Sequence, residues 1–315
     1  MSLALLFPGQ GVQHAAMLRW LDAEPLAAPL LKAMALGDDW RAHMADEAWA
    51  SSNRVAQPLM TGVALAAWAA LAPQLPQPTM VAGYSVGELA AFSVAGLFGA
   101  DEALHLARQR AAFMDRCASA SAGAGAGAAP GGLLAVSGLK VASLDALLAQ
   151  FNLAVAIRLG ADRCVLGGPL AALDAITPEL LAGGAELTPL KVRLPSHTPA
   201  MATAALDFAA LLAGMDWPRN ARALVVCNID GAGRRESTAL KQALARQIDH
   251  TVEWDHCMTT LAERRPRCVL EVGPGNSLAR MWAARFPEMP VRSVDEFHSA
   301  QAVVDWVERA LDDGR

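Results

Sequence analysis

The chain has 315 residues, of which 54% are hydrophobic and 18% are charged, so it can bury a sizeable core and intrinsic disorder is excluded as its class. Its 26 Lys and Arg against 31 Asp and Glu give a net charge of -5, which argues against a nucleic-acid-binding protein, because such proteins usually carry a basic surface. Only 5% of the residues are aromatic, and the alanine-rich composition favours a helix-rich protein over an all-β one.

The N-terminal part of the chain alternates short apolar runs with longer helical patterns. Leu3 to Phe7 is an apolar run ended by Pro8-Gly9, which predicts a buried strand that leads into a loop. Thr79 to Ala82 predicts a second buried strand, followed by a turn at 83–87. Helices are predicted at about 16–34, 55–71, from about 88 onward, and 101–117. Strands that alternate with helices predict a mainly parallel sheet covered on both faces.

The pattern changes after residues 118–132, ASASAGAGAGAAPGG, a low-complexity stretch that we expect to be too flexible to pack and to mark a boundary. Shorter elements follow it: strands at 133–136, 153–157, 163–166 and 186–192, with helices at 143–150 and 170–181. This β-α-β-β-α-β order is the ferredoxin-like pattern. Larger elements return from about residue 194, including strands at 223–227 and 268–272. We therefore predict a small domain of residues 131–192 inserted into a large α/β domain formed by 1–130 and 193–315.

The sequence also bears on the location of the protein. Its five cysteines are scattered without a C-x-x-C pair, which predicts free thiols in a reducing compartment. The N-terminal apolar run lacks a preceding basic region, so it does not match a targeting signal. The longest apolar helical candidate, Gly62 to Ala72, is too short to span a bilayer. We expect a cytoplasmic protein with neither a membrane nor a nucleic acid as a partner.

Gly83-Tyr-Ser85-Val-Gly87 lies between a predicted strand and a predicted helix, which is the context of a nucleophile elbow. Such a turn holds its serine in a strained conformation, and flanking glycines let neighbouring backbone pass close by. The side chain then lies at a helix N-terminus, whose dipole favours developing negative charge. The alternative is an ordinary turn, because the pentapeptide is common. The flanking elements favour Ser85 as a nucleophile.

A serine nucleophile needs a base, and His197 is the candidate. It lies in Leu194-Pro-Ser-His-Thr-Pro199, where two prolines hold a loop, and a fixed loop histidine suits that role. The alternative is a surface imidazole. His250 and His256 are rivals that lie in a polar helical stretch and are expected to face solvent. No aspartate is evidently placed to orient the base, so a full Ser-His-Asp triad is not predicted.

Three glycine-rich segments are candidates for binding roles. Phe7-Pro-Gly-Gln-Gly11 follows the first strand and can present backbone N–H groups to an oxyanion. Its dinucleotide-binding interpretation fails because no third glycine follows at the required spacing. Gly273-x-Gly275 fails in the same way, and the segment 123–127 follows no strand. The His and Cys spacings offer no convincing metal-ligand set, so no metal site is predicted.

Five ordered motifs, FPGQG at 7–11, GYSVGE at 83–88, QRAAFM at 109–114, PSH at 195–197 and EVGPG at 271–275, resemble the malonyl-CoA:acyl-carrier-protein transacylase family. Their order and spacing match over about 3–281. The resemblance implies an α/β-hydrolase-like large domain with a mainly parallel sheet and an inserted ferredoxin-like small domain. It also implies that Ser85 carries the acyl ester and that His197 is its general base.

The resemblance implies further site roles. The backbone carbonyl of Gln247 would orient the histidine in place of an aspartate. The backbone N–H groups of Gln10 and Val86 would form the oxyanion hole. Arg110 would pair with the free carboxylate of a malonyl group, and a bidentate guanidinium can distinguish malonyl from acetyl. The alternative for Arg110 is an exposed helix cation. Structural roles are expected for Glu88, Asn228 and Glu271.

The sequence departs from the family pattern at Tyr84, where most members have histidine, and at Leu159-Gly-Ala-Asp-Arg-Cys164, which replaces an Asn-Ser-Pro-Gly-Gln segment. Both departures resemble the transacylase (epsilon) subunit of bacterial malonate decarboxylase. That resemblance implies a carrier subunit with a phosphopantetheine-type arm as the acceptor, whereas the alternative is the acyl carrier protein of fatty-acid synthesis.

The expected activity is ping-pong malonyl transfer from malonyl-CoA, with CoA as a product and no bound cofactor. Two other classes stay open. A serine hydrolase or thioesterase would share G-x-S-x-G but would leave Arg110 without a clear task. A non-catalytic carrier-binding subunit would keep the fold without forming an acyl-enzyme.

Overall fold

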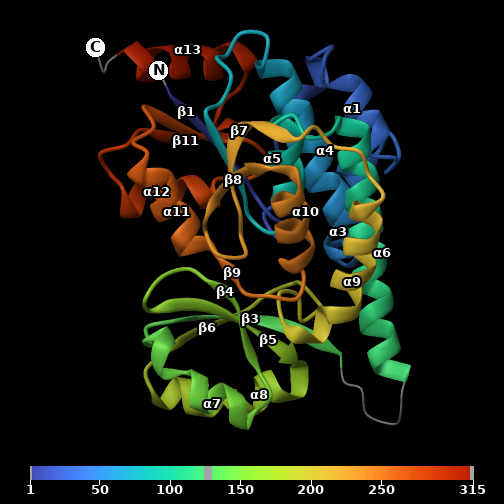
Figure 1. Cartoon of the computed structure of the whole chain (residues 1–315), viewed down its shortest axis with the longest axis vertical. Coiled ribbons are helices and arrows are strands. Elements are labelled where there is room, and N and C mark those ends of the chain that lie inside the picture. Colours follow the sequence, from blue (N-terminus) through green and yellow to red (C-terminus); the bar gives the residue numbers. More distant parts are fainter. Residues whose placement is uncertain (1, 124–129, 313–315) are drawn as a thin grey trace.

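The computed structural model describes residues 2–123 and 130–312, which form two packed parts (Figure 1). The larger part is built on a six-stranded sheet with the order β11-β10-β1-β2-β7-β8. Its strands are β1 (Leu3–Phe7), β2 (Met80–Gly83), β7 (Asn220–Val226), β8 (Gly233–Glu236), β10 (Cys268–Glu271) and β11 (Val291–Ser293). All neighbours pair in parallel except β7 and β8. The predicted mainly parallel α/β sheet is therefore confirmed.

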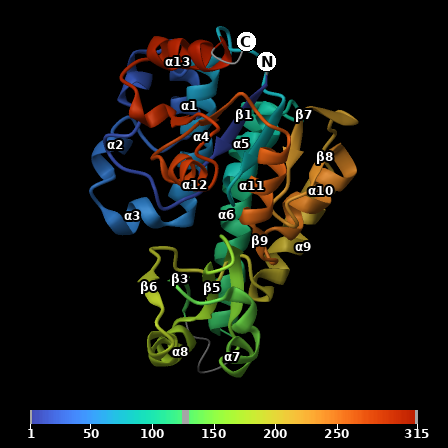
Figure 2. The same ribbon diagram turned by 90° about the vertical axis from the view of Figure 1, so that its left-hand side faces the viewer.

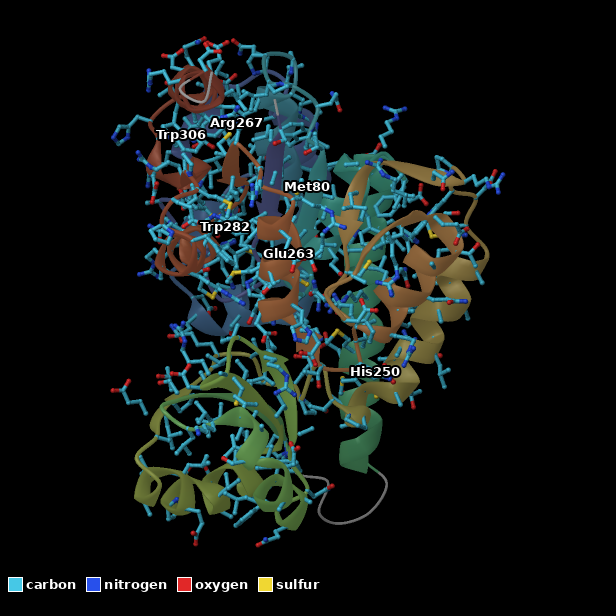
Figure 3. All side chains as sticks on the ribbon, turned by 60° about the vertical axis from the view of Figure 1, so that its left-hand side comes forward. Met80, His250, Glu263, Arg267, Trp282 and Trp306 are labelled. Carbon is cyan, nitrogen blue, oxygen red and sulfur yellow. The ribbon has the colours of Figure 1, made fainter. Side chains whose placement is uncertain are left out.

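Helices cover both faces of this sheet, because its central strands are apolar on both sides. Along β1, the side chains of Leu3, Leu5 and Phe7 enter one core cluster, and those of Ala4 and Leu6 enter the other. The first face is packed mainly by α4 (Asn53–Leu71), α5 (Gly87–Val94), α6 (Ala100–Gly123), α9 (Ala202–Ala213), α10 (Ser237–Arg246) and α13 (Ala300–Asp312). The second is packed by α11 (Trp254–Glu263) and α12 (Ser277–Arg285). Met80 and Trp282 belong to this second core (Figure 3).

The smaller part is a five-stranded sheet with the order β6-β3-β5-β4-β9. Its elements are β3 (Gly131–Ser137), α7 (Asp145–Gln150), β4 (Ala154–Arg158), β5 (Arg163–Pro169), α8 (Leu170–Ala182) and β6 (Glu186–Pro189), in the ferredoxin-like chain order. Helices α7 and α8 lie on the side of this sheet away from the larger part (Figures 1 and 2). The opposite face is therefore turned toward the large sheet. The predicted domain boundaries stay a prediction, since β9 (Val252–Glu253), from beyond residue 192, pairs with β4.

Several predicted elements differ from those observed. The single helix expected over 16–34 is instead a 3-10 turn at Arg19–Ala23 and a short helix, α1 (Ala28–Ala33). Pro25 separates them, because proline has no N–H to continue the hydrogen-bond ladder. Two short helices, α2 (Trp40–His43) and α3 (Glu47–Ser51), were not predicted. The strand expected over 186–192 ends at Pro189.

The tract at 118–132 was predicted to be too flexible to pack, and this was wrong for both of its ends. Residues 118–123 continue α6, and residues 131 and 132 begin β3. Residues 124–129 lie outside the described residues. Within the described ranges, no helix is both long enough and apolar enough to cross a membrane.

Candidate active site

Ser85 lies in the tight turn between β2 and α5, with a backbone φ of 54°. The turn requires both of its glycines. A Cβ on Gly83 would lie 2.0 Å from the backbone carbon of Gly87, and a Cβ on Gly87 would lie 2.2 Å from the carbonyl oxygen of Phe7. The helix therefore starts directly against the end of β1. This close packing holds the serine in the left-handed region, which non-glycine residues seldom adopt.

The structure brings His197 to Ser85. Its Nε2 lies 2.8 Å from the Ser85 Oγ, and its Nδ1 lies 2.5 Å from the backbone carbonyl oxygen of Gln247. A carbonyl can only accept a hydrogen bond, so Nδ1 carries the ring proton and Nε2 is left to accept the serine proton. The His197 backbone has a φ of 63° and donates its N–H to the Ile248 carbonyl at 2.8 Å. This pattern of hydrogen bonds would allow His197 to act as a base toward Ser85, with a backbone carbonyl orienting the ring.

The electrostatic surroundings keep this imidazole neutral. His197 is 2% exposed, and burial together with the nearby Arg110 charge lowers its pKa to about 3. The hydrogen bond to the Gln247 carbonyl opposes that shift. A neutral imidazole at physiological pH can accept a proton, which a base must do.

Two backbone N–H groups near the elbow, those of Gln10 and Val86, have no hydrogen-bond partner among the described residues, 2–123 and 130–312. Val86 precedes the first turn of α5, and Gln10 lies in the loop after β1, which the close packing of Gly9 on Tyr84 holds beside the elbow. The Gln10 side chain donates to Asn53 Oδ1 at 3.3 Å. Free N–H donors beside a nucleophile are the chemical requirement of an oxyanion hole.

Arg110 projects from α6 and is 2% exposed, so the alternative of a surface helix cation is wrong. Its two terminal nitrogens donate to Gln57 Oε1 at 2.9 Å and to Gln247 Oε1 at 2.8 Å, while its buried Nε has no partner among the described residues. Burial lowers its pKa to about 10, and the negative charge of Glu88 opposes that shift. The guanidinium therefore stays charged at neutral pH.

Ser85, His197 and Arg110 line one cavity of about 260 Å³, together with Gln10. Its remaining wall is largely apolar and comes partly from the small sheet and the segment after it, through Leu133, Ile157, Leu190 and Val192. The cavity thus lies between the two parts of the molecule. Its lining combines apolar side chains with a buried cation and with the Ser85–His197 pair.

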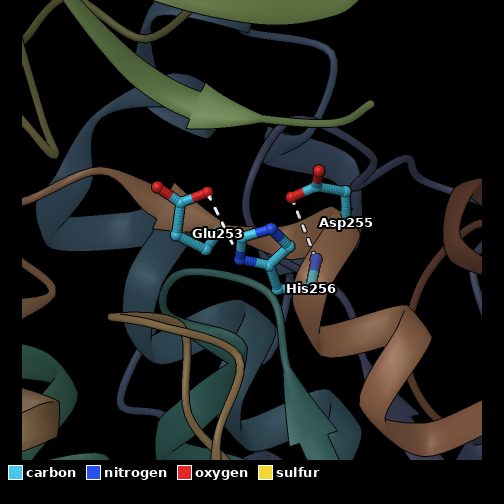
Figure 4. A group of neighbouring side chains, drawn as sticks. All are labelled: Glu253, Asp255 and His256. Atoms are coloured by element: carbon cyan, nitrogen blue, oxygen red, sulfur yellow. Dashed lines mark hydrogen bonds and ion pairs between the residues drawn. The ribbon is translucent and has the colours of Figure 1, made fainter. Parts of the chain in front are cut away.

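The rival histidines do not reach Ser85. His250 lies near the end of the large part that faces the small one (Figure 3), where its Nδ1 is 2.6 Å from Asp249 Oδ1. His256, on α11, forms a group with Glu253 and Asp255 whose ligand atoms lie within 4.8 Å of one another (Figure 4). Glu253 is already engaged by Arg158 Nε at 3.0 Å. Exposed acidic groups of this kind are common without a metal ion, and among the residues that the structure describes nothing else at this position points to one.

Sequence reasoning missed Gln57 and Asn53, which hold the side chains of Arg110 and Gln10. It also missed that the Gln247 side chain, and not only its carbonyl, enters the site. Gln57 was detectable in part, because it is a polar residue inside an otherwise apolar helical segment, and a buried polar side chain needs a partner.

Residues 4–309 match the acyl transferase domain family. The malonyl CoA-acyl carrier protein transacylase of Mycobacterium tuberculosis is 32% identical over 300 residues, which cover 93% of this chain and 96% of that protein. The Escherichia coli protein of the same name is 28% identical over 292 residues, covering 87% of this chain and 90% of that protein.

Solved structures give the same relationship. The acyl-carrier-protein S-malonyltransferase from Burkholderia pseudomallei superposes with a TM-score of 0.85 at 28% identity and covers 97% of this chain and 100% of that one. A malonyl-transacylase solved in complex with a type II PKS acyl-carrier protein superposes with a TM-score of 0.86 at 25% identity, covering 97% and 99%.

Proposed function

The chain belongs to the acyl transferase family and is an acyltransferase; from that membership we propose that it moves a malonyl group from malonyl-CoA, through an ester on Ser85, to the thiol of a phosphopantetheine-type arm on an acyl carrier protein. The observation that carries the proposal is the buried Arg110 guanidinium in the same cavity as the Ser85–His197 pair. A serine and a histidine alone would serve any acyl group. A buried cation gives a reason to choose an acyl group with a free carboxylate.

In the first half of the cycle, the Ser85 Oγ attacks the thioester carbonyl carbon while His197 Nε2 takes the hydroxyl proton. The N–H groups of Gln10 and Val86 donate to the oxyanion of the tetrahedral intermediate. The intermediate collapses with cleavage of the carbon–sulfur bond, and His197 returns the proton to the departing CoA sulfur. The products are free CoA and the malonyl ester of Ser85.

In the second half, the carrier thiol enters the largely apolar cavity and gives its proton to His197. The sulfur attacks the ester carbonyl, the same two N–H groups hold the oxyanion, and Ser85 leaves with the proton that His197 returns. Malonyl-CoA is thus a substrate and CoA a product. Every proton and charge is handled by named groups of the chain, so the proposed cycle needs no metal and no resident cofactor.

The malonyl carboxylate is proposed to pair with Arg110 throughout both halves. The unpartnered Nε and the two terminal nitrogens, now held by neutral amides, give a guanidinium that can exchange one neutral partner for a carboxylate. An acetyl group offers no such partner. The expected consequence is a preference for malonyl over acetyl groups.

Two carriers are candidates for the acceptor of the malonyl group. The relatives reported above are named for acyl carrier protein as the acceptor, which favours the carrier of fatty-acid synthesis. A second candidate, the carrier subunit of malonate decarboxylase, is favoured by Tyr84 and by the segment 159–164. Tyr84 lines the cavity and packs edge-on against Trp254, with ring centroids 5.2 Å apart.

The test is intact mass spectrometry after brief mixing with malonyl-CoA, in parallel with acetyl-CoA and with the Ser85→Ala variant. The expected result is one malonyl increment on the native chain alone. Steady CoA release without an increment would mean a hydrolase, and neither signal would mean a non-catalytic binding subunit or a different acyl donor. Chasing the acyl-enzyme with each of the two carriers then identifies the acceptor as the one that removes the increment.

A further inference from the structure

Glu88 is a fully buried carboxylate directly behind the nucleophile, in the first turn of α5. Its Oε1 accepts the backbone N–H of Asn228 at 2.7 Å, and its Oε2 accepts the side-chain amide of Gln247 at 3.0 Å. It does not line the substrate cavity. A buried carboxylate is costly to keep unless its partners require it, so these two contacts indicate a purpose beyond packing.

One branch of this network leads to the cation. The Gln247 Oε1 accepts a hydrogen bond from a terminal nitrogen of Arg110 at 2.8 Å, while the Gln247 Nε2 donates to Glu88. Within the described part of the chain no carboxylate forms a direct ion pair with Arg110, and the negative charge of Glu88, one amide away, raises the pKa of Arg110 against the effect of burial. Burial raises the pKa of Glu88 to about 7, against the opposing effects of Asn228, Gln247 and the charges of Arg110 and Arg234.

The other branch leads to the nucleophile. Asn228 accepts the Ser85 N–H on its Oδ1 at 2.8 Å and donates its Nδ2 to the Gly83 carbonyl at 2.6 Å. Gln247 Nε2 donates to the Ser85 carbonyl at 2.8 Å. Both backbone polar groups of the strained serine are therefore held by residues that bond to Glu88.

We propose that Glu88 is a positioning residue for malonyl transfer: its carboxylate orients the Gln247 amide, which presents Arg110 to the malonyl carboxylate, and it anchors Asn228, which fixes the Ser85 backbone. The inference rests on the proposed role of Arg110. It explains why a carboxylate, rather than an amide, is buried at this position.

The directions of the hydrogen bonds in this network explain why position 88 needs a carboxylate. In its ionised form, which predominates above its pKa of about 7, Glu88 is acceptor-only. It then dictates that the Gln247 NH₂ points to Glu88 and Ser85 and that the Gln247 oxygen points to Arg110. In a Glu88→Gln variant, an amide that keeps its oxygen toward Asn228 places a second NH₂ against the NH₂ of Gln247. If the Gln247 amide then turns over, its NH₂ faces the donors of Arg110. Either arrangement leaves a donor facing a donor, and the contact to Arg110 loses its orientation.

Glu271 offers a matched control. It is also fully buried, and burial raises its pKa to about 8. Its oxygens accept the backbone N–H groups of Ala279 at 2.7 Å and Leu278 at 3.3 Å, at the start of α12, so it has no link to Arg110. Glu271→Gln makes the same chemical change at a comparable depth. It should lower thermal stability without changing the choice of acyl group.

The experiment measures kcat and KM for acyl-enzyme formation from malonyl-CoA and acetyl-CoA in the native chain, Glu88→Gln, Glu88→Asp, Glu271→Gln and Arg110→Gln. In Glu88→Gln the ratio of malonyl to acetyl kcat/KM should fall by about 10-fold or more, as expected when a hydrogen bond to a charged group is disturbed. Glu88→Asp keeps an acceptor-only group and should recover part of the ratio. A purely structural role would lower both substrates equally.

The outcomes separate the two proposals. If Arg110→Gln keeps the native malonyl preference, the proposed function fails. If Arg110→Gln loses the preference but Glu88→Gln keeps the native ratio, the inference about Glu88 alone is overturned. If Glu88→Gln fails to fold, the malonyl-to-acetyl ratio is measured in Gln247→Met instead. That variant removes the side-chain amide and keeps the backbone carbonyl that orients His197. An unchanged malonyl-to-acetyl ratio in that variant would also overturn the inference.

Discussion

Replacing Arg110 by Gln is the substitution that most directly tests malonyl recognition. The guanidinium is 2% exposed, so a malonyl carboxylate beside it is also removed from water. Breaking a buried charge pair by removing one partner costs about 3–5 kcal/mol. At about 1.4 kcal/mol per factor of ten, kcat/KM for malonyl-CoA should fall by about 100-fold to 1,000-fold or more. Glutamine keeps part of the side-chain volume and can still hydrogen-bond to Gln57, so the fold around position 110 should be retained.

The assay follows acyl-enzyme formation by rapid quenching and intact mass, with malonyl-CoA and acetyl-CoA measured separately. Acetyl transfer should change far less, because an acetyl group has no carboxylate to lose its partner. Thermal unfolding of the variant checks that the fold survives. A folded Arg110→Gln protein with an unchanged malonyl-to-acetyl ratio would refute the reasoning that the buried cation selects the acyl group.

Three further predictions concern the elbow and the two buried titratable groups. Gly87→Ala places a Cβ 2.2 Å from the Phe7 carbonyl oxygen, so it should cost about 1–3 kcal/mol in urea unfolding and suppress acyl-enzyme formation. Gly99→Ala, where no neighbour lies within 4 Å, should do neither, and equal behaviour of the two variants would contradict the steric argument. Burial and the neighbouring guanidinium lower the pKa of His197 to about 3, so its ring should stay neutral from about pH 5 to 8. The NMR signals of the ring, assigned by their loss in His197→Gln, report this state directly. A protonated ring in that range would contradict the prediction. The folded-state pKa of Glu88, about 7, lies above its ordinary value of 4.5, so its contribution to stability is present below pH 4.5 and is lost as pH rises through 7. Relative to Glu88→Gln, the native chain should therefore gain stability on acidification across that window, and a constant difference in unfolding free energy would show that the group does not titrate there.

The elements that could be predicted from the sequence are those whose determinants are local. The strand, turn and helix around Ser85 follow from an apolar run, two glycines and a second, mainly apolar segment within about 79–94. The pairing of Arg110 with Gln57 and of Gln247 with Ser85 spans 53 and 162 residues of sequence, and no local pattern encodes it. The family resemblance supplied the Gln247 carbonyl but gave no sign of its side-chain contacts.

The error at 118–123 has a physical reason of its own. The alanine and serine tract was interpreted from composition as a linker, yet alanine is the strongest helix former. It follows an established helix, so each added residue extends existing hydrogen bonds without the cost of a new nucleus. The preceding helix determined the conformation of residues 118–123, and the composition of the tract alone does not show that a helix precedes it.

The replacement of an aspartate by the Gln247 carbonyl has a chemical consequence for the choice of acceptor. A carboxylate at Nδ1 would stabilise the imidazolium, whereas a neutral carbonyl and a nearby guanidinium leave the pKa of His197 lowered to about 3. A weak base still receives a proton from a thiol, whose pKa is about 8.5, far more readily than from water, whose pKa is about 15.7. The departing CoA sulfur, for the same reason, needs little help from a strong acid. In the proposed second half-reaction, where a thiol and water would compete for the same ester, this difference in pKa favours a thiol acceptor over hydrolysis. The preceding attack by the Ser85 hydroxyl is common to a transferase and a hydrolase and does not distinguish them.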